Sequence, residues 1–152
     1  MASEPGVSGG LGVPKLSEVS VGDQIGSTTI HLTRADLVRY ADASGDQNPI
    51  HQSDEVARSV GLPGVIAHGM LTMGAAVRVV VDWCGDPGAI VDYGTRFTGQ
   101  VPVDAETGAD LEVSAVVGAV DAEAGTVRVD VSATCGGSRV LGRARAVVRL
   151  PA

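Results

Sequence analysis

Aromatic side chains are scarce in this 152-residue chain, which has one Trp, two Tyr and one Phe. So few rings provide no platform on which nucleic-acid bases could stack. Basic residues are also few: 11 Lys and Arg stand against 18 Asp and Glu, and the formal net charge is −7. Such a chain has no broad basic face to neutralise phosphates. The composition therefore argues against a nucleic-acid partner.

Cysteine is nearly absent as well. Cys84 and Cys135 stand far apart, with no Cys-x-x-Cys pattern and no nearby histidine. A disulfide is formally possible, but reduced buried thiols in a cytosolic protein are the favoured interpretation. Residues 1–6 lack the basic and apolar regions of a signal peptide, and the apolar run 75–81 is too short to span a bilayer. We therefore expect a cytoplasmic protein without a membrane span.

The length and the 44% hydrophobic content are typical of one soluble globular domain. Residues 1–14 are rich in Gly, Ser and Pro and predict a flexible N-terminal tail, which leaves residues 15–152 as the domain. No internal repeat is present. With so few aromatics, the core has to be built from Val, Ala, Leu and Ile.

The first half of the chain predicts a strand followed by helices. Thr33 is a good N-cap for a helix, and the turn over 45–51 ends that helix. The last helical stretch is the longest and is apolar nearly all round, so other structure should wrap it. The expected elements are a strand over 25–32 and helices over 34–44, 53–60 and 67–83.

The second half changes to a period of two, rich in Val and Thr, which predicts strands. Tight turns at 121–125 and 136–137 would join consecutive strands into an antiparallel sheet. A long buried helix followed by such a sheet favours an α+β fold in which the sheet curls around the helix. The expected strands are 90–97, 109–120, 126–134 and 139–150.

Residues 40–51 are the most informative segment. They place a carboxylate, Asp46, and an imidazole, His51, around a turn formed by Gly45 and Pro49. Such a turn can aim both side chains at one space, where they could share the activation of one water. Taken alone, an aspartate in this kind of turn is equally often a residue that bonds its own backbone. The composition does not decide between the two interpretations.

Residues 40–57 read Tyr-x-x-x-Ser-Gly-Asp-x-Asn-Pro-Ile-His-x-Ser-x-x-x-Ala, which resembles the signature of the MaoC-like, (R)-specific enoyl hydratase family. Residues 66–71, Ile-Ala-His-Gly-Met-Leu, resemble the start of that family's central helix, and Arg-Phe at 96–97 and Pro-Val at 102–103 follow in the expected order. A narrower resemblance is to the B subunit of the (3R)-hydroxyacyl-carrier-protein dehydratases, and it is carried by residues 21–24, 67–74 and 85–89.

The resemblance implies a single hot-dog fold and the reversible dehydration of (3R)-hydroxyacyl thioesters to trans-2-enoyl thioesters in fatty-acid or related acyl-chain metabolism. Asp46 and His51 would hold one water as a catalytic dyad. The backbone N–H of Gly69 would be the oxyanion donor at the start of the central helix. Asn48 would brace the turn behind Asp46 rather than act directly. No metal and no cofactor are expected.

Other residues near these motifs are not assigned a catalytic role. His68 is interpreted as a packing or hydrogen-bonding residue at the start of the helix rather than a second base, and His31 is assigned no role. Ser53 and Val77 stand where some members of the family have an aspartate and a hydroxyl residue. These departures leave the dyad intact but put the preferred acyl chain length in doubt.

The expected partner is an acyl thioester of CoA or of acyl carrier protein. Because both are anionic, a local basic patch is expected, although a solvated or salt-bridged face is an alternative use for its residues. The candidates are Arg78, Arg96, Arg139, Arg143 and Arg145. The resemblance also implies a dimer, either a homodimer or a heterodimer with a sister hot-dog subunit.

Two alternative functions remain open. One is a hot-dog acyl thioesterase, which the full Gly-Asp-x-Asn-Pro-x-His pattern disfavours. The other is a non-catalytic acyl-binding subunit, which the presence of both Asp46 and His51 disfavours.

Overall fold

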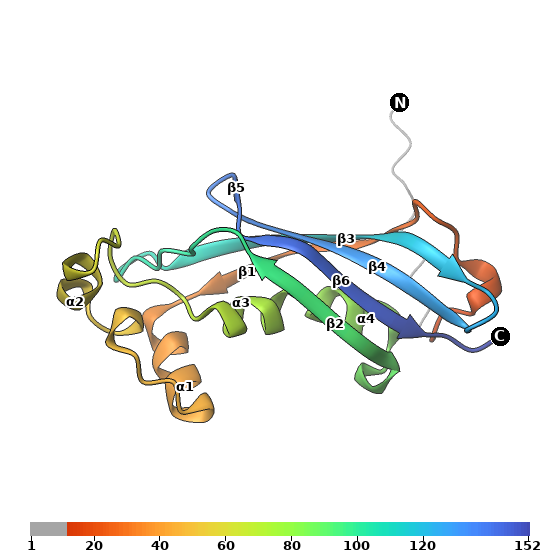
Figure 1. Ribbon diagram of the computed structural model, residues 1–152, viewed down its shortest axis with the longest axis horizontal. Coiled ribbons are helices and arrows are strands. Elements are labelled where there is room, and N and C mark those ends of the chain that lie inside the picture. The colour runs from red at the N-terminus through yellow and green to blue at the C-terminus, as the bar shows by residue number, and fades with distance from the viewer. Residues whose placement is uncertain (1–11) are drawn as a thin grey trace.

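Figure 1 shows the computed structural model, which describes residues 12–152. All but three residues of the predicted tail over 1–14 lie outside the described residues, so the tail and the predicted domain over 15–152 stay predictions. The α-helices are α1 (Arg34–Ser44), α2 (Asp54–Ser59), α3 (Gly69–Ala76) and α4 (Arg78–Cys84), and the 3₁₀ turns are Leu16–Glu18, Pro49–His51 and Pro87–Ala89. The strands are β1 (Gln24–Leu32), β2 (Ile90–Phe97), β3 (Ala109–Asp121), β4 (Thr126–Cys135), β5 (Ser138–Arg139) and β6 (Leu141–Arg149).

The strands form one antiparallel sheet in the order β1-β3-β4-β6-β2, with β5 paired to β4. The turns predicted at 121–125 and 136–137 are confirmed, because β3 pairs with β4 and β4 pairs with β5 directly across them. The long strands β3 and β4 lie in the middle of the sheet, whereas β1 and β2 are its edges. The expected antiparallel, α+β architecture is therefore present.

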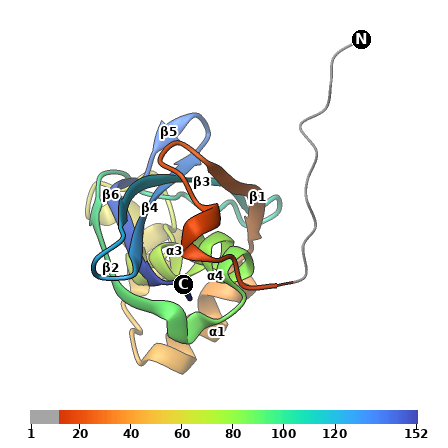
Figure 2. The same ribbon diagram turned by 90° about the vertical axis from the view of Figure 1, so that its right-hand side faces the viewer.

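The sheet curves around α3 and α4, and Figure 2 shows these helices inside the curve. Side chains on the inner face alternate with outward-facing ones along each strand, as the period of two requires. Burying one valine or leucine side chain of this kind contributes about 1.5–3 kcal/mol. The inward residues of the two central strands are Leu111, Val113, Ala115, Val117, Val127, Val129, Val131 and Ala133.

The single helix predicted over 67–83 is wrong in two respects. The structure starts it at Gly69, because the preceding backbone is extended, and divides it at Val77 into α3 and α4. Val77 has φ −70° and ψ −12°, and its carbonyl accepts the N–H groups of both Val80 and Val81, which is a local tightening within a run of β-branched residues. Met70 is 59% exposed, so the sheet covers only one side of α3. In the described part of the chain, no helix is long and apolar enough to cross a membrane.

The strand predicted over 139–150 is also divided. β5 ends at Arg139 and β6 begins at Leu141. Between them, the N–H of Val140 donates to the Ala133 carbonyl, and the Val140 carbonyl accepts the N–H of Thr98. The remaining predicted elements agree with the structure to within one residue at each end.

The two cysteines are free thiols, as the sequence predicted. Only Cys84 is buried, however, so the expectation of two buried thiols is wrong for Cys135. Cys135 ends β4 and is half-buried, and this burial raises the pKa of its thiol.

Candidate active site

The turn after α1 fixes the carboxylate of the predicted dyad. Gly45 ends the helix with φ 82°, a left-handed conformation that glycine adopts without strain. One oxygen of Asp46, Oδ1, accepts the N–H of Asn48 at 3.1 Å, and the Asn48 side chain accepts the N–H of Ile50 at 3.2 Å. The Asn48 side chain thus braces the turn, and its supporting role in catalysis stays a prediction. Asp46 itself is exposed, which leaves its second oxygen free to meet a ligand.

His51 lies at the other end of this turn and is only 7% exposed. Its Nδ1 is 2.7 Å from the carbonyl oxygen of Ile66. Because a carbonyl can only accept, Nδ1 carries the proton in this contact, and in the neutral ring Nε2 keeps its lone pair. This fixes both the orientation and the tautomer that a general base requires.

His68 completes the group, although the sequence predicted only a packing and hydrogen-bonding role for it. Its ring stacks on that of His51, with centroids 3.8 Å apart, and the ring of Tyr40 meets it edge-on at 4.7 Å. Nε2 of His68 donates to the backbone carbonyl of Asp46 at 3.2 Å. The ring is 1% exposed, and this burial lowers its pKa, so His68 is neutral at physiological pH. The predicted packing and hydrogen bond are confirmed, and both of them act on the dyad.

The three side chains are close enough to share one small ligand. A carboxylate oxygen of Asp46 and one ring nitrogen each of His51 and His68 lie within 4.8 Å of one another. Two hydrogen bonds of about 2.8 Å meeting at one water span roughly 4.6 Å, so the upper limit of 4.8 Å is compatible with one water held between Asp46 and His51. Chelation of a metal is a poorer fit: the imidazoles are stacked 25° from parallel, so their in-plane lone pairs do not converge on one point.

The predicted oxyanion donor, Gly69, lines a cavity of about 170 Å³ beside His51. Gly69 is the first residue of α3, and the first N–H groups of any helix have no intrahelical acceptor. The side chain of His68 does not cap them either. A Cβ on Gly69 would lie 3.0–3.3 Å from the ring of Phe97, so any larger residue there would press against that ring. The cavity is lined by His51, Ile66, Ala67, Gly69, Thr72, Phe97, Gly99, Gln100, Val101 and Val140.

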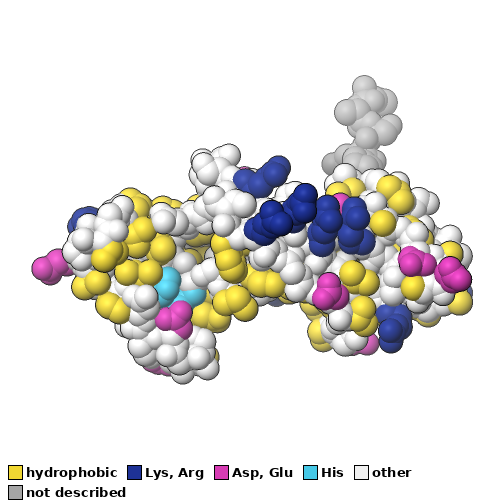
Figure 3. All heavy atoms as spheres, viewed as in Figure 1, with side chains coloured by type: hydrophobic (Ala, Val, Ile, Leu, Met, Phe, Trp, Pro, Cys, Tyr) yellow, Lys and Arg dark blue, Asp and Glu magenta, His cyan; other side chains and the backbone are white. Residues whose placement is uncertain are grey.

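Asp46 is not part of this lining; it lies on the exposed turn next to His51. Figure 3 shows the histidine side chains reaching the surface with an acidic side chain beside them and hydrophobic side chains around them. A larger hollow of about 510 Å³ lies elsewhere, on the outer face of the sheet, and is lined mainly by Ser and Thr of β1, β3 and β4. It contains none of the predicted site residues.

Two extended segments far apart in the sequence place Gly69 next to the histidines. Residues 65–67 pair with residues 101–103: the N–H of Ala67 bonds the Val101 carbonyl at 2.9 Å, and the N–H of Val103 bonds the Val65 carbonyl at 3.0 Å. The carbonyl of Ile66, which lies between these two bonds, accepts the hydrogen bond from Nδ1 of His51. This short ladder therefore fixes the base and one wall of the cavity together.

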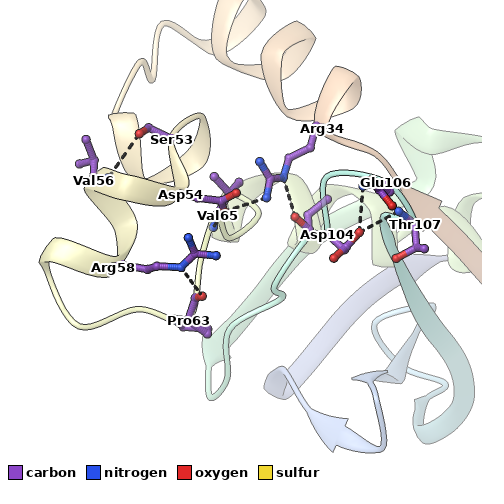
Figure 4. A network of polar contacts seen from close by, with 11 residues as sticks. Arg34, Ser53, Asp54, Val56, Arg58, Pro63, Val65, Asp104, Glu106 and Thr107 are labelled. Atoms are coloured by element: carbon purple, nitrogen blue, oxygen red, sulfur yellow. Dashed lines mark hydrogen bonds and ion pairs between the residues drawn. The ribbon is translucent and has the colours of Figure 1, made fainter.

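A polar network holds the segment of α1 and α2 against this ladder (Figure 4). The guanidinium of Arg34 donates to the Val103 carbonyl at 2.5 Å and to the Asp54 carboxylate at 2.8 Å. The same carboxylate oxygen accepts the N–H of Val65 at 2.9 Å. The hydrogen bond from Val65, followed by that from Arg34, holds the pKa of Asp54 below its usual value. The network links α1, α2 and both extended segments.

Comparison with known proteins agrees with this geometry. The family model of the MaoC like domain matches residues 18–135. Over 82 residues the chain is 37% identical to 3-hydroxyacyl-thioester dehydratase X of Mycobacterium tuberculosis, a match that covers 54% of this chain and 28% of that protein. A solved MaoC-like dehydratase superposes with a TM-score of 0.88 at 42% identity, covering 91% of this chain and 43% of the other. The R-hydratase PhaJ1 of Pseudomonas aeruginosa superposes with a TM-score of 0.75 at 27% identity, covering 90% and 85%.

The chain belongs to the MaoC-like dehydratase family, and its fold is the hot-dog fold, as the sequence resemblance implied. It spans less than a third of the length of the first curated relatives that it matches.

Proposed function

We propose that this protein catalyses the reversible dehydration of (3R)-hydroxyacyl thioesters to trans-2-enoyl thioesters. The observation that carries the proposal is the hydrogen bond that fixes the tautomer of His51, together with a carboxylate oxygen of Asp46 within 4.8 Å of a His51 ring nitrogen, beside a cavity that Gly69 lines. The relatives named as hydroxyacyl-thioester dehydratase and R-hydratase support the same reaction class.

In the hydration direction, a water held between the dyad gives a proton to Nε2 of His51 while its oxygen attacks C3 of the enoyl thioester. Asp46 orients the water and shares the proton, and a proton is then delivered to C2. Dehydration runs the same steps backwards: the C2 proton is removed, and the C3 hydroxyl leaves as water.

Negative charge develops on the thioester oxygen as C3 is attacked. The N–H of Gly69, at the positive end of α3, would stabilise that charge. Removing one such donor costs on the order of 3 kcal/mol in enzymes where it has been measured. Neither a metal nor a cofactor is required by this chemistry, and the expectation that none is used stays a prediction.

His68 supports the dyad from behind. It holds the Asp46 backbone through one hydrogen bond and the His51 ring through stacking, so it limits movement of both catalytic groups. Because burial keeps it neutral, it does not repel the imidazolium that His51 becomes after it accepts a proton.

We infer that the functional unit is a dimer. Strand β2 is an edge of the sheet, so one side of its backbone is free to pair. Three large hydrophobic side chains are exposed on β2 and α3, namely Met70 (59%), Val91 (47%) and Phe97 (53%). Light scattering coupled to gel filtration distinguishes a homodimer from a monomer that needs a sister subunit. A location in the cytoplasm stays a prediction.

Incubation of the purified protein with crotonyl-CoA and a longer trans-2-enoyl-CoA tests the proposed reaction. Loss of the enoyl absorbance without release of thiol is expected. Release of free thiol would instead identify a thioesterase. Neither change, in the presence of a co-purified sister subunit, would identify a non-catalytic acyl-binding chain.

A further inference from the structure

Five of the 11 basic residues of this acidic chain are exposed arginines on β2, β5 and β6. Figure 3 shows basic side chains gathered in a row over these strands, on the same face as the histidines. We define the arginine row as Arg96, Arg139, Arg143 and Arg145, which lie at the end of these strands nearest the cavity; the fifth arginine, Arg149, ends β6 at the far end. Of the predicted basic candidates, Arg78 is excluded, because it lies on α4 beside Asp82.

The row begins at the rim of the cavity. Phe97 and Val140 line the cavity, and their chain neighbours Arg96 and Arg139 are exposed outside it. Gly99 also lines the cavity, and a Cβ on it would lie 2.7 Å from the Arg139 carbonyl oxygen. A chain that enters the cavity beside Gly99 therefore passes close to the backbone that carries Arg139.

Most of this charge is not neutralised from within the molecule. Among the described residues, Arg96, Arg139 and Arg143 make no ion pair. Arg145 Nε is 3.9 Å from Oδ1 of Asp130, and the two oxygens of that carboxylate already accept hydrogen bonds from Nε and Nη2 of Arg128. Three of the four arginines of the row are thus unpaired, on a chain with a net charge of −7.

The backbone at Arg143 indicates that the row is not incidental. Gly94 pairs with Arg145 and Arg96 pairs with Gly142, so Thr95 faces two residues of β6 across a β-bulge. Arg143 lies in this bulge with φ 46°. Among the described residues, it is the only residue other than glycine that has a positive φ. Glycine would occupy that position without strain. An arginine is kept there at a cost to the fold, which is expected if its charge has a function.

We propose that the arginine row is the docking surface for an acyl carrier protein, the small acidic protein that presents an acyl chain on a phosphopantetheine arm. This rests on the proposed function, because the arm would deliver its thioester past Gly99 into the cavity. Two features favour a protein over free CoA. From Arg139 to Arg145 the row extends up to about 20 Å, at roughly 3.3 Å per residue, which is long for one nucleotide headgroup.

The second feature is the lack of a site for adenine. Of the aromatic residues nearest the row, Tyr93 donates its hydroxyl to the Met73 carbonyl at 2.8 Å on the inner side of the sheet, and Phe97 packs over Gly69. Phe97, at the rim, is 53% exposed, but β4, β5 and β6 contain no aromatic residue, so the row beyond the rim has no ring of its own strands on which a base could stack.

The test compares Arg139→Gln/Arg143→Gly with the matched control Arg39→Gln/Arg78→Gln, which removes the same charge from side chains 72% and 74% exposed on α1 and α4. At low salt the row variant should raise KM for a crotonyl-carrier-protein thioester about tenfold, and the control should change it less than twofold. The rise should shrink at high salt. With crotonyl-CoA, KM should rise less than threefold. An equal rise for both thioesters, or no rise for either, would overturn the proposal.

Two further measurements separate this proposal from the proposed function. Binding of fluorescently labelled holo-carrier protein, followed by anisotropy, does not depend on turnover. If the wild type hydrates neither thioester, the proposed function fails, and the binding data still decide the docking surface. If the wild type hydrates crotonyl-CoA but does not bind carrier protein, only the docking surface fails. Arg143→Gly alone should weaken carrier binding without lowering Tm, whereas a purely structural arginine would lower Tm.

Discussion

The segment of α1 and α2 and the sheet-and-helix body are held together by different physical means. The body buries a continuous set of Val, Ala and Leu side chains between the sheet and α3 and α4. The α1–α2 segment contributes few fully buried hydrophobic side chains, chiefly Leu37, Ala41 and Ala57, and is fixed to the body through Arg34 and Asp54. Packing therefore dominates the stability of one region, and a few polar contacts orient the other.

The candidate site lies where these two regions meet. Asp46 and His51 come from the α1–α2 segment, and Gly69 comes from the body. His68 belongs to the body but contacts both residues of the dyad. Substitutions in the sheet-and-helix body should therefore change mainly stability, whereas substitutions in the dyad should change mainly catalysis.

The largest effect is expected from the dyad. Asp46→Asn and His51→Gln should each lower kcat by about 10²–10⁴-fold, because each removes a group that moves or orients the proton. Tm should change little, since glutamine can still donate to the Ile66 carbonyl. Hydration kinetics and thermal melts check both points, and Asp82→Asn, an exposed carboxylate on α4, is the control. Full activity in both dyad variants would contradict the mechanism.

A substitution in the body should show the opposite pattern. Leu111→Ala removes a side chain that is fully buried in β3 and should lower the free energy of unfolding by about 2–5 kcal/mol. The kcat of the protein that remains folded should stay within twofold of the wild type. Urea denaturation gives the stability, and Val38→Ala, at a position 45% exposed on α1, should change it by less than about 0.5 kcal/mol. A large fall in kcat at low temperature would mean that the two regions are not separable.

His68 should give an intermediate effect on catalysis. His68→Phe keeps an aromatic ring against His51 but loses the donor to the Asp46 carbonyl, so kcat should fall about 10–100-fold with KM nearly unchanged. His68→Gln keeps a donor and loses the stacking, which separates the two contributions. A rise in KM without a fall in kcat in either variant would argue against a positioning role.

The smallest effect is expected from Asp54 and should depend on pH. The pKa of its carboxyl is lowered in the folded state, so its contribution to stability is present above the unfolded pKa, near 3.8, and is lost as pH falls through the folded value. Asp54→Asn should therefore lower Tm at pH 7, and the gap from the wild type should close as the pH falls below about 4. Melts across pH 3–7 measure the gap. A gap that widens in acid would contradict the assigned network.

Local signals in the sequence predicted much of this molecule. Thr33 accepts the N–H of Asp36 and Gly45 adopts a left-handed conformation, and α1 begins and ends beside them as predicted. The turn that carries Asp46 was also predictable, because Asn48 and Pro49 act over a few residues. Such elements are determined by neighbours in the chain.

The predictions that failed depended on distant contacts. The central helix begins at Gly69 because residues 65–67 pair with residues 101–103, and apolar periodicity carries no information about that pairing. The role of His68 in packing and hydrogen bonding was predicted, but its partners were not, because its hydrogen bond to Asp46 joins positions 22 residues apart. The His-Gly pair at the start of the helix was the available signal, but it did not reveal the partner.

The sequence by itself determined which chemistry-bearing residues exist, the turn between Asp46 and His51, and the alternation that makes a sheet, because each depends on local backbone preference or period. Only the tertiary structure decided the tautomer of His51, the stacking of His68 on it, and the alignment of the arginine row at the cavity rim. Those arrangements depend on strand register and on carbonyl groups supplied by distant segments, and burial within the folded chain sets the protonation of His68.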